Sequence, residues 1–177
     1  MANYSEINNK GIQTRLDERY AKEINALQAL GFKHLAYCLE DHGPYSALKH
    51  SLAALYAMRK KEVLLIHWPF RLSLANVLMA AENPPTIALC MGLGVKFYTS
   101  FYDGTVIISS DFSSRSVPQA RSKVLRLPSQ GNLAGTWAEH QTKALALSGQ
   151  MEFLSERMTF GDYVLMSAFE EEAVQFF

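Results

Sequence analysis

The sequence predicts an α+β domain in which an antiparallel sheet of about four to six strands is covered by amphipathic helices from both ends of the chain. Three observations support this. Asp103-Gly104 lies between two runs rich in aromatic and β-branched residues, which predicts a β-hairpin over 95–110. Strand-like runs precede it at 32–40, 63–67 and 86–91, and the last of these favours an antiparallel meander. Apolar residues recur at helical spacing near both ends of the chain.

Length and composition set the class of protein. The chain has 177 residues, so we expect residues 1–177 to form a single domain. Lys plus Arg and Asp plus Glu both number 17, which argues against a protein that coats nucleic acid or anionic lipid. The first residues are polar, and no apolar run is long enough to cross a membrane, so we expect a cytoplasmic protein.

The N-terminal part predicts a loose polar arm over 1–13 and then a helix. Thr14 and Asp17 resemble a capping box that opens this helix, and Gly31 stands where a glycine should end it. The apolar face of the helix repeats at spacings of four and three: Leu16, Tyr20, Ile24, Leu27 and Leu30.

The next elements are a strand over 32–40, a helix over 46–60 and a short strand over 63–67. Residues 71–82 fit a helix or a buried strand, because periodicity alone does not separate the two. Asn83-Pro84-Pro85 then breaks the chain, and a strand over 86–91 follows.

The hairpin itself predicts two different faces. With a two-residue loop, Phe101 lies opposite Val106. Tyr98, Tyr102 and Ile107 then share a face that we expect a helix of this chain to cover, with a second subunit or a ligand as the alternatives. The other face is predicted to be core: Val95, Phe97, Thr99, Phe101, Val106 and Ile108.

The segment 111–132 lacks a clear hydrophobic period. It carries four basic residues that are candidates for binding a phosphate, a carboxylate or an acidic partner: Arg115, Arg121, Lys123 and Arg126. An ordinary solvated loop is the alternative, and 123–127 suits a short edge strand. A helix over 132–149 follows, with Trp137 and His140 on its apolar face. Thr159 and Asp162 resemble a second capping box, which opens a last helix.

The sequence contains no strong catalytic or cofactor-binding motif, so we assign no catalytic residue, metal ligand or cofactor. His34 and Cys38 would lie about 13 Å apart on a strand, too far to act as a nucleophile and base. Glu40, Asp41 and His42 are adjacent on a turn, which is poor geometry for a metal even with His67 or His140. The two cysteines, Cys38 and Cys90, fit small buried side chains.

The order of Leu30–Phe32, the Phe97–Thr105 hairpin and a later helix with His140 resembles a set of small bacterial domains of unknown function. The resemblance spans most of the chain. It supports the fold and implies no activity.

These features favour a non-enzymatic binding or interaction module that forms a homodimer or binds another protein. The alternative is a domain or enzyme that binds a small anionic or aromatic ligand between the sheet and the helix at 132–149. Its expected ligand contacts are Tyr98, Tyr102, Arg115, Arg121, Trp137 and His140. No contact with nucleic acid is expected, because no aromatic residues are interleaved with the basic ones.

Overall fold

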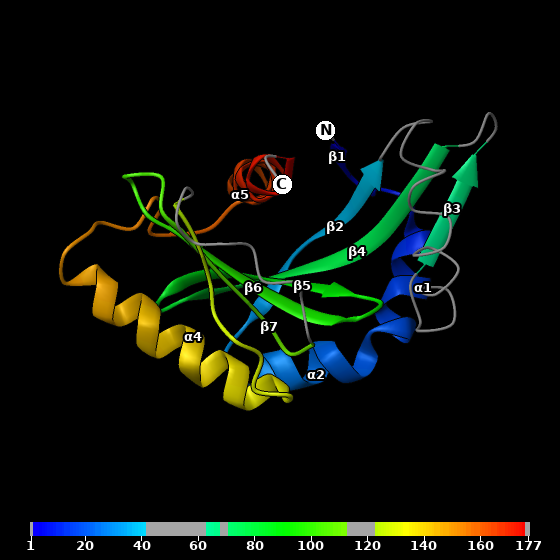
Figure 1. Ribbon diagram of the computed structural model, residues 1–177. Coiled ribbons are helices and arrows are strands. Elements are labelled where there is room, and N and C mark those ends of the chain that lie inside the picture. The colour runs from blue at the N-terminus through cyan, green and yellow to red at the C-terminus, as the bar shows by residue number, and fades with distance from the viewer. Residues whose placement is uncertain (1, 42–62, 68–70, 113–122, 176–177) are drawn as a thin grey trace.

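The computed structural model describes residues 2–41, 63–67, 71–112 and 123–175 (Figure 1). The predicted helix at 46–60 and the candidate residues Arg115 and Arg121 lie outside these ranges. The α+β class is confirmed, but the described residues form an eight-stranded sheet, larger than the sequence predicted.

The strands are β1 (Asn3–Glu6), β2 (Lys33–Asp41), β3 (Val63–His67), β4 (Arg71–Glu82), β5 (Pro85–Met91), β6 (Gly94–Ser100), β7 (Val106–Ser110) and β8 (Val124–Arg126). Their order in the sheet is β1-β2-β4-β5-β6-β7-β8. Every pair is antiparallel except β7 and β8, which run parallel. Ala75 pairs with both Leu39 and Val63, so β3 lies on the edge of β4 opposite β2, the edge that β5 also uses.

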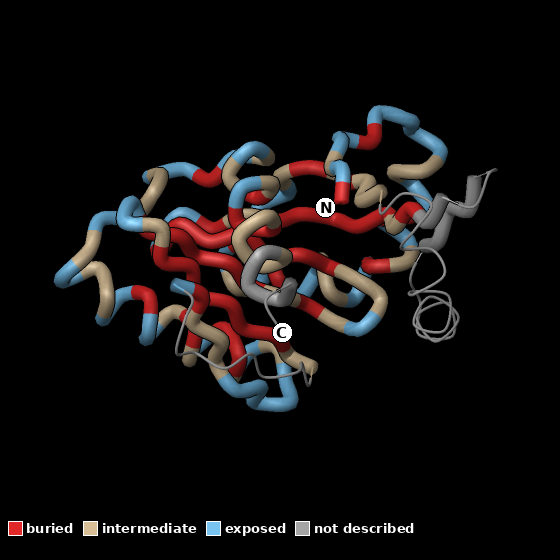
Figure 2. The backbone as a smooth tube through the Cα atoms, turned by 45° about the horizontal axis from the view of Figure 1, so that its top comes forward, coloured by how far each residue is buried: buried red, intermediate tan, exposed pale blue. Residues whose placement is uncertain are grey.

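The helices are α1 (Lys10–Arg19), α2 (Ala21–Ala29), α4 (Leu133–Ser148) and α5 (Phe160–Gln175). Figure 1 shows α1, α2 and α4 on one side of the sheet and α5 on the other. Figure 2 shows the central strands buried, with exposed residues on the outer turns and helix surfaces. Within the described residues, no helix has the length and apolar character needed to span a membrane.

Each face of the sheet has its own core. Leu16, Leu27 and Trp137 from the helices pack with Val77 and Phe97 on one side. On the other side, residues of α5 pack against the sheet, and the core there includes Tyr98, Ile108, Tyr163 and Met166. The sheet is therefore the middle of three layers, as its burial on both faces requires.

The N-terminal region corrects two expectations. Residues 1–13 are not a loose arm, because Asn3–Glu6 pair with β2 as strand β1. The helix is divided at Tyr20, and it begins earlier than predicted, with Asn9 accepting a hydrogen bond from the Ile12 N–H at 3.1 Å. Thr14 therefore lies inside α1. The predicted C-terminal glycine is confirmed: Gly31 has a φ of +93°, and the Phe32 N–H reaches back to the Leu27 carbonyl.

Residues 71–82, left open between helix and strand, form β4. Val77 and Met79 face the core beneath α1, α2 and α4, whereas Leu78 faces the core beneath α5. A strand buried on both faces carries apolar residues in succession, and this removes the alternation that would have identified it.

The hairpin register differs from the prediction by one residue. Val106 lies opposite Ser100, and Ile107 lies opposite Thr99. The loop is longer than two residues because Gly104, at a φ of +87°, follows a turn in which its N–H bonds to the Phe101 carbonyl. A slip of one residue moves every β7 side chain to the other face, so Ile107 faces α4 and Val106 and Ile108 face α5.

Polar side chains cap the N-termini of the two C-terminal helices. Asn132 caps α4 by accepting from the Gly135 N–H at 2.6 Å. The predicted capping box of α5 is confirmed: the Thr159 N–H donates to Asp162 at 2.8 Å, and the Asp162 N–H donates to the Thr159 hydroxyl at 3.3 Å.

Candidate functional site

Trp137 and His140 lie beneath α4, against the sheet. The Trp137 ring centroid is 4.8 Å from that of Phe32 and 5.3 Å from that of Phe97. His140 is fully buried. These side chains pack directly on one another and on the sheet, so the contacts between α4 and the sheet are made by the chain itself.

His140 belongs to a chain of buried hydrogen bonds. Its Nδ1 lies 2.7 Å from the Ser109 hydroxyl, and its Nε2 lies 2.8 Å from the Thr99 hydroxyl. Thr99 lies 2.7 Å from Thr86, whose hydroxyl donates to the Pro84 carbonyl at 3.0 Å. Because that carbonyl can only accept, Thr99 donates to Thr86, and His140 must then donate from Nε2 and accept from Ser109 at Nδ1.

Burial keeps His140 neutral. Burial lowers its pKa to about 3. Ser109 and His140 resemble a nucleophile and base, but both are buried and each is bonded within the network. A general base must reach substrate or a water, so we assign this network to the positioning of α4 on the sheet.

The candidate tyrosines do not join Trp137 and His140. Tyr98 lies on the opposite face of the sheet, in the core beneath α5, and Tyr102 is 78% exposed in the hairpin turn. The structure instead brings Tyr98 close to Arg126, one of the four basic residues noted in 111–132, because both surround the carboxylate of Glu170.

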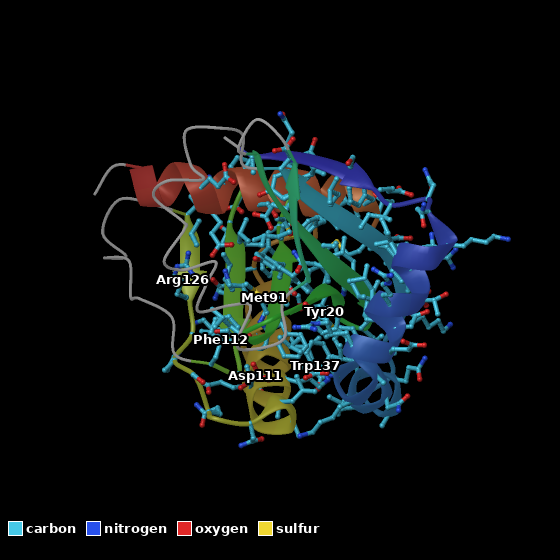
Figure 3. All side chains as sticks on the ribbon, turned by 90° about the vertical axis from the view of Figure 1, so that its right-hand side faces the viewer. Tyr20, Met91, Asp111, Phe112, Arg126 and Trp137 are labelled. Carbon is cyan, nitrogen blue, oxygen red and sulfur yellow. The ribbon has the colours of Figure 1, made fainter. Side chains whose placement is uncertain are left out.

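Three sheet residues surround Glu170 of α5, and we call Lys96, Tyr98 and Arg126 the cradle. Lys96 Nζ and Arg126 Nη2 lie 3.1 and 2.7 Å from Glu170 Oε1. The Tyr98 hydroxyl donates to Oε2 at 2.8 Å. Figure 3 shows Arg126 on β8, below α5 in that view. The cradle is a site for a carboxylate that the protein's own helix fills.

The charges of the cradle determine the ionisation of Glu170. Burial alone would raise the pKa of this carboxyl, but the positive charges of Lys96 and Arg126 and the hydrogen bond from Tyr98 outweigh it and hold the pKa at about 2. Burial and the neighbouring Glu170 raise the pKa of Tyr98 well above its ordinary value. Tyr98 is therefore a protonated donor, and Glu170 is an ionised acceptor.

The carboxylate of Glu171, next to Glu170 on α5, contacts strand β1 and the residue before it, at the opposite edge of the sheet from β8. Glu171 accepts from the Tyr4 hydroxyl at 3.0 Å and from the Ala2 N–H at 3.2 Å. Tyr163 lies between the two tyrosines, edge-on to Tyr4 at 5.6 Å and to Tyr98 at 5.9 Å. Because β1 and β8 end the strand order, these contacts require the sheet to curve around α5.

A partly buried carboxylate, that of Asp111, lies where β6 begins and β7 ends. Asp111 accepts from the Val95 N–H at 2.8 Å, and burial raises its pKa against the effect of this bond. Asp111 and Phe112 stand against Gly94 at this end of the sheet (Figure 3). Since the acceptor is engaged by the backbone, we assign Asp111 to holding the two strand ends together.

The thiols are not available for chemistry. Cys38 and Cys90 are free and fully buried. Burial raises the pKa of Cys38 to about 12 and also raises that of Cys90. In the described part of the chain, no group of three or more His, Cys, Asp or Glu side chains is placed to hold a metal ion.

The sequence did not identify Lys96 or Glu170 as site residues. One signal for Glu170 was present, because three glutamates late in a helix oppose the helix dipole. Glutamates in such a position are stabilised when cations face them. The fold places Lys96 and Arg126 there, and the sequence alone does not specify this placement.

A scan against family models and searches of curated proteins and of solved structures find no match to this chain. This agrees with the resemblance to small domains of unknown function. The fold and the site define the class: a three-layered α+β domain whose curved sheet carries a buried carboxylate-binding cradle.

Proposed function

We propose that the protein is a non-enzymatic binding module, and that the cradle is where it contacts an acidic group of a partner. One observation carries the proposal: Lys96 and Arg126 converge on a single carboxylate while their side chains stay 17% and 12% exposed. Cations fixed at a partly exposed site form charge-assisted hydrogen bonds that recognise anions.

The placement of the reactive side chains favours binding over catalysis. His140, Ser109, Cys38 and Cys90, the nucleophilic and basic side chains discussed above, are all buried. A substrate could reach them only if a helix left the sheet. Charge pairing at the edge of α5 needs no such step.

The alternative, a small-molecule pocket between the sheet and residues 132–149, has less support. Two of its expected walls, Trp137 and His140, contact Phe97 with centroid distances of 5.3 and 5.8 Å. A third wall, Tyr98, lies on the other face of the sheet.

The test of binding against turnover is a thermal-shift screen with acidic peptides, citrate and metal ions, followed by NMR of each compound that raises the melting temperature. A compound at 100 times its Kd adds about 2.7 kcal/mol to the stability. We expect acidic compounds to bind and to be recovered unchanged. Conversion of a bound compound into product would contradict the proposal.

The partner that we propose first is a second copy of the chain in a bacterial cytoplasm, because a net charge of zero leaves little repulsion between copies. Sedimentation equilibrium over a wide concentration range tests this. We expect a dimer whose dissociation constant rises in Arg126→Glu. A strict monomer would exclude the homodimer and leave an acidic group on another protein as the partner.

A further inference from the structure

The cradle has more positive charge and more donors than Glu170 uses. Lys96 and Arg126 carry two positive charges, and within the described ranges both pair with the single carboxylate of Glu170. Arg126 Nε is buried and has no hydrogen-bond partner among the residues that the structure describes. Buried donors are normally paired, so an unused guanidinium N–H beside an excess cation indicates an incompletely filled anion site.

The donors are positioned by the sheet and not by α5. Tyr98 pairs with Ile108, and Ile108 pairs with Arg126, so Tyr98 and Arg126 lie in one row across three strands. Lys96 precedes Tyr98 by two residues and projects from the same face of β6. The arrangement of donors therefore persists when Glu170 is absent, as a preorganised binding site requires.

We propose that the cradle binds a phosphate-type dianion, which displaces Glu170. A dianion neutralises both Lys96 and Arg126, whereas one carboxylate neutralises half of their charge. A phosphate group also has enough oxygens to accept from Lys96 Nζ, the Tyr98 hydroxyl, and Arg126 Nη2 and Nε together. The carboxylate of Glu170, where it lies, accepts from Nζ, Nη2 and the hydroxyl but does not reach Nε.

Glu170 and the phosphate group compete for the same donors. Glu170 is 14% exposed and lies five residues before the last position of α5, so its side chain keeps some contact with solvent. By linkage, whatever weakens the contact of Glu170 with the cradle strengthens phosphate binding. This inference rests on the proposed binding function, because it names the chemical group that the same site takes.

The experiment is calorimetric titration of the full chain with inorganic phosphate and, separately, with phenyl phosphate, against sodium chloride at matched ionic strength. We expect saturable binding to the wild type. Glu170→Gln removes the competing charge and keeps the shape, so we expect binding about tenfold tighter. Arg126→Gln should abolish binding. Glu18→Gln on the exposed surface of α1 makes the same change in net charge and should bind as the wild type does.

If Glu170→Gln does not fold, NMR of the wild type decides the matter, since phosphate should shift the Arg126 Nε–H resonance in a saturable way. A response to phosphate equal to that to chloride would overturn the inference, as would saturable binding that Arg126→Gln leaves intact. Binding of phenyl phosphate alone would support the site and identify its source as an esterified phosphate. A failure here with an Arg126-dependent dimer would leave the proposed function standing.

Discussion

Replacing Glu170 with glutamine should produce a loss of stability that depends on pH. The substitution keeps the size of the side chain and an oxygen for the Tyr98 hydroxyl. It removes the negative charge that lies 3.1 Å from Lys96 Nζ and 2.7 Å from Arg126 Nη2. The two cations are then left mostly buried without their counterion, which typically costs about 3 to 5 kcal/mol.

The ionisation of Glu170 sets the pH range of this effect. Its pKa falls from 4.5 in the unfolded chain to about 2 in the folded protein, which corresponds to about 3 kcal/mol at neutral pH. Because the folded-state pKa is the lower one, this stabilisation is fully present above pH 4.5. It is lost as the pH falls from 4.5 towards about 2, where the carboxyl is protonated in both states.

The assay is urea unfolding of the wild type, Glu170→Gln and Glu18→Gln at a series of pH values from neutral to strongly acidic. The difference in unfolding free energy between the wild type and Glu170→Gln should be about 3 kcal/mol at neutral pH and should shrink steadily below pH 4.5. Glu18→Gln controls for net charge and should stay close to the wild type. A difference that is constant across the acidic range would refute the ion-pair reasoning.

Three further predictions concern the core, the turns and the thiols. His140→Phe removes hydrogen bonds at both ring nitrogens and should destabilise the protein by about 2 to 4 kcal/mol in urea; a change below about 0.5 kcal/mol would mean that the network is dispensable. Gly94→Ala places a Cβ against a carboxylate and a phenyl ring, whereas Gly131→Ala meets nothing within 4 Å, so Gly94→Ala should cost about 2 kcal/mol more in the same assay. Cys38 and Cys90 should react with a thiol reagent at mildly alkaline pH only after unfolding, and rapid labelling of the native protein would show that the burial is wrong.

Local signals in the sequence identified several element ends. The Thr159 and Asp162 pair opens α5, and Gly31 ends α2, because caps and C-terminal glycines act through bonds between near neighbours. The predicted start of α1 at Thr14 was wrong, because Asn9 caps the helix five residues earlier. The Thr14 hydroxyl instead donates to the Lys10 carbonyl inside the helix.

The loop length and register of the hairpin could not be predicted from such local signals. Asp103-Gly104 correctly marked a hairpin, but a dipeptide permits more than one loop length. Here Asp103 accepts from both the N–H and the hydroxyl of Thr105, and this favours the longer loop. The one-residue difference in register decided which face of the sheet each side chain of β7 joins.

In the cradle, too, the sequence indicated individual residues but not the contact between them. Tyr98 and Arg126 were each noted in the sequence, one as part of a hairpin face and the other as part of a basic segment. Their contact with Glu170 spans separations of 72 and 44 residues. No periodicity or motif connects positions that far apart, because their approach depends on the curvature of the sheet and on the docking of α5.

The sequence by itself determined the α+β class, the positions of most strands and helices, and the low reactivity of its two cysteines. It could do so because hydrophobic period, capping and turn chemistry act over a few residues. The tertiary structure alone decided the hairpin register, the strand identity of residues 71–82, and the pairing of Glu170 with the cradle. All three features depend on which face of the sheet packs against which helices, and that packing is a property of the whole folded chain.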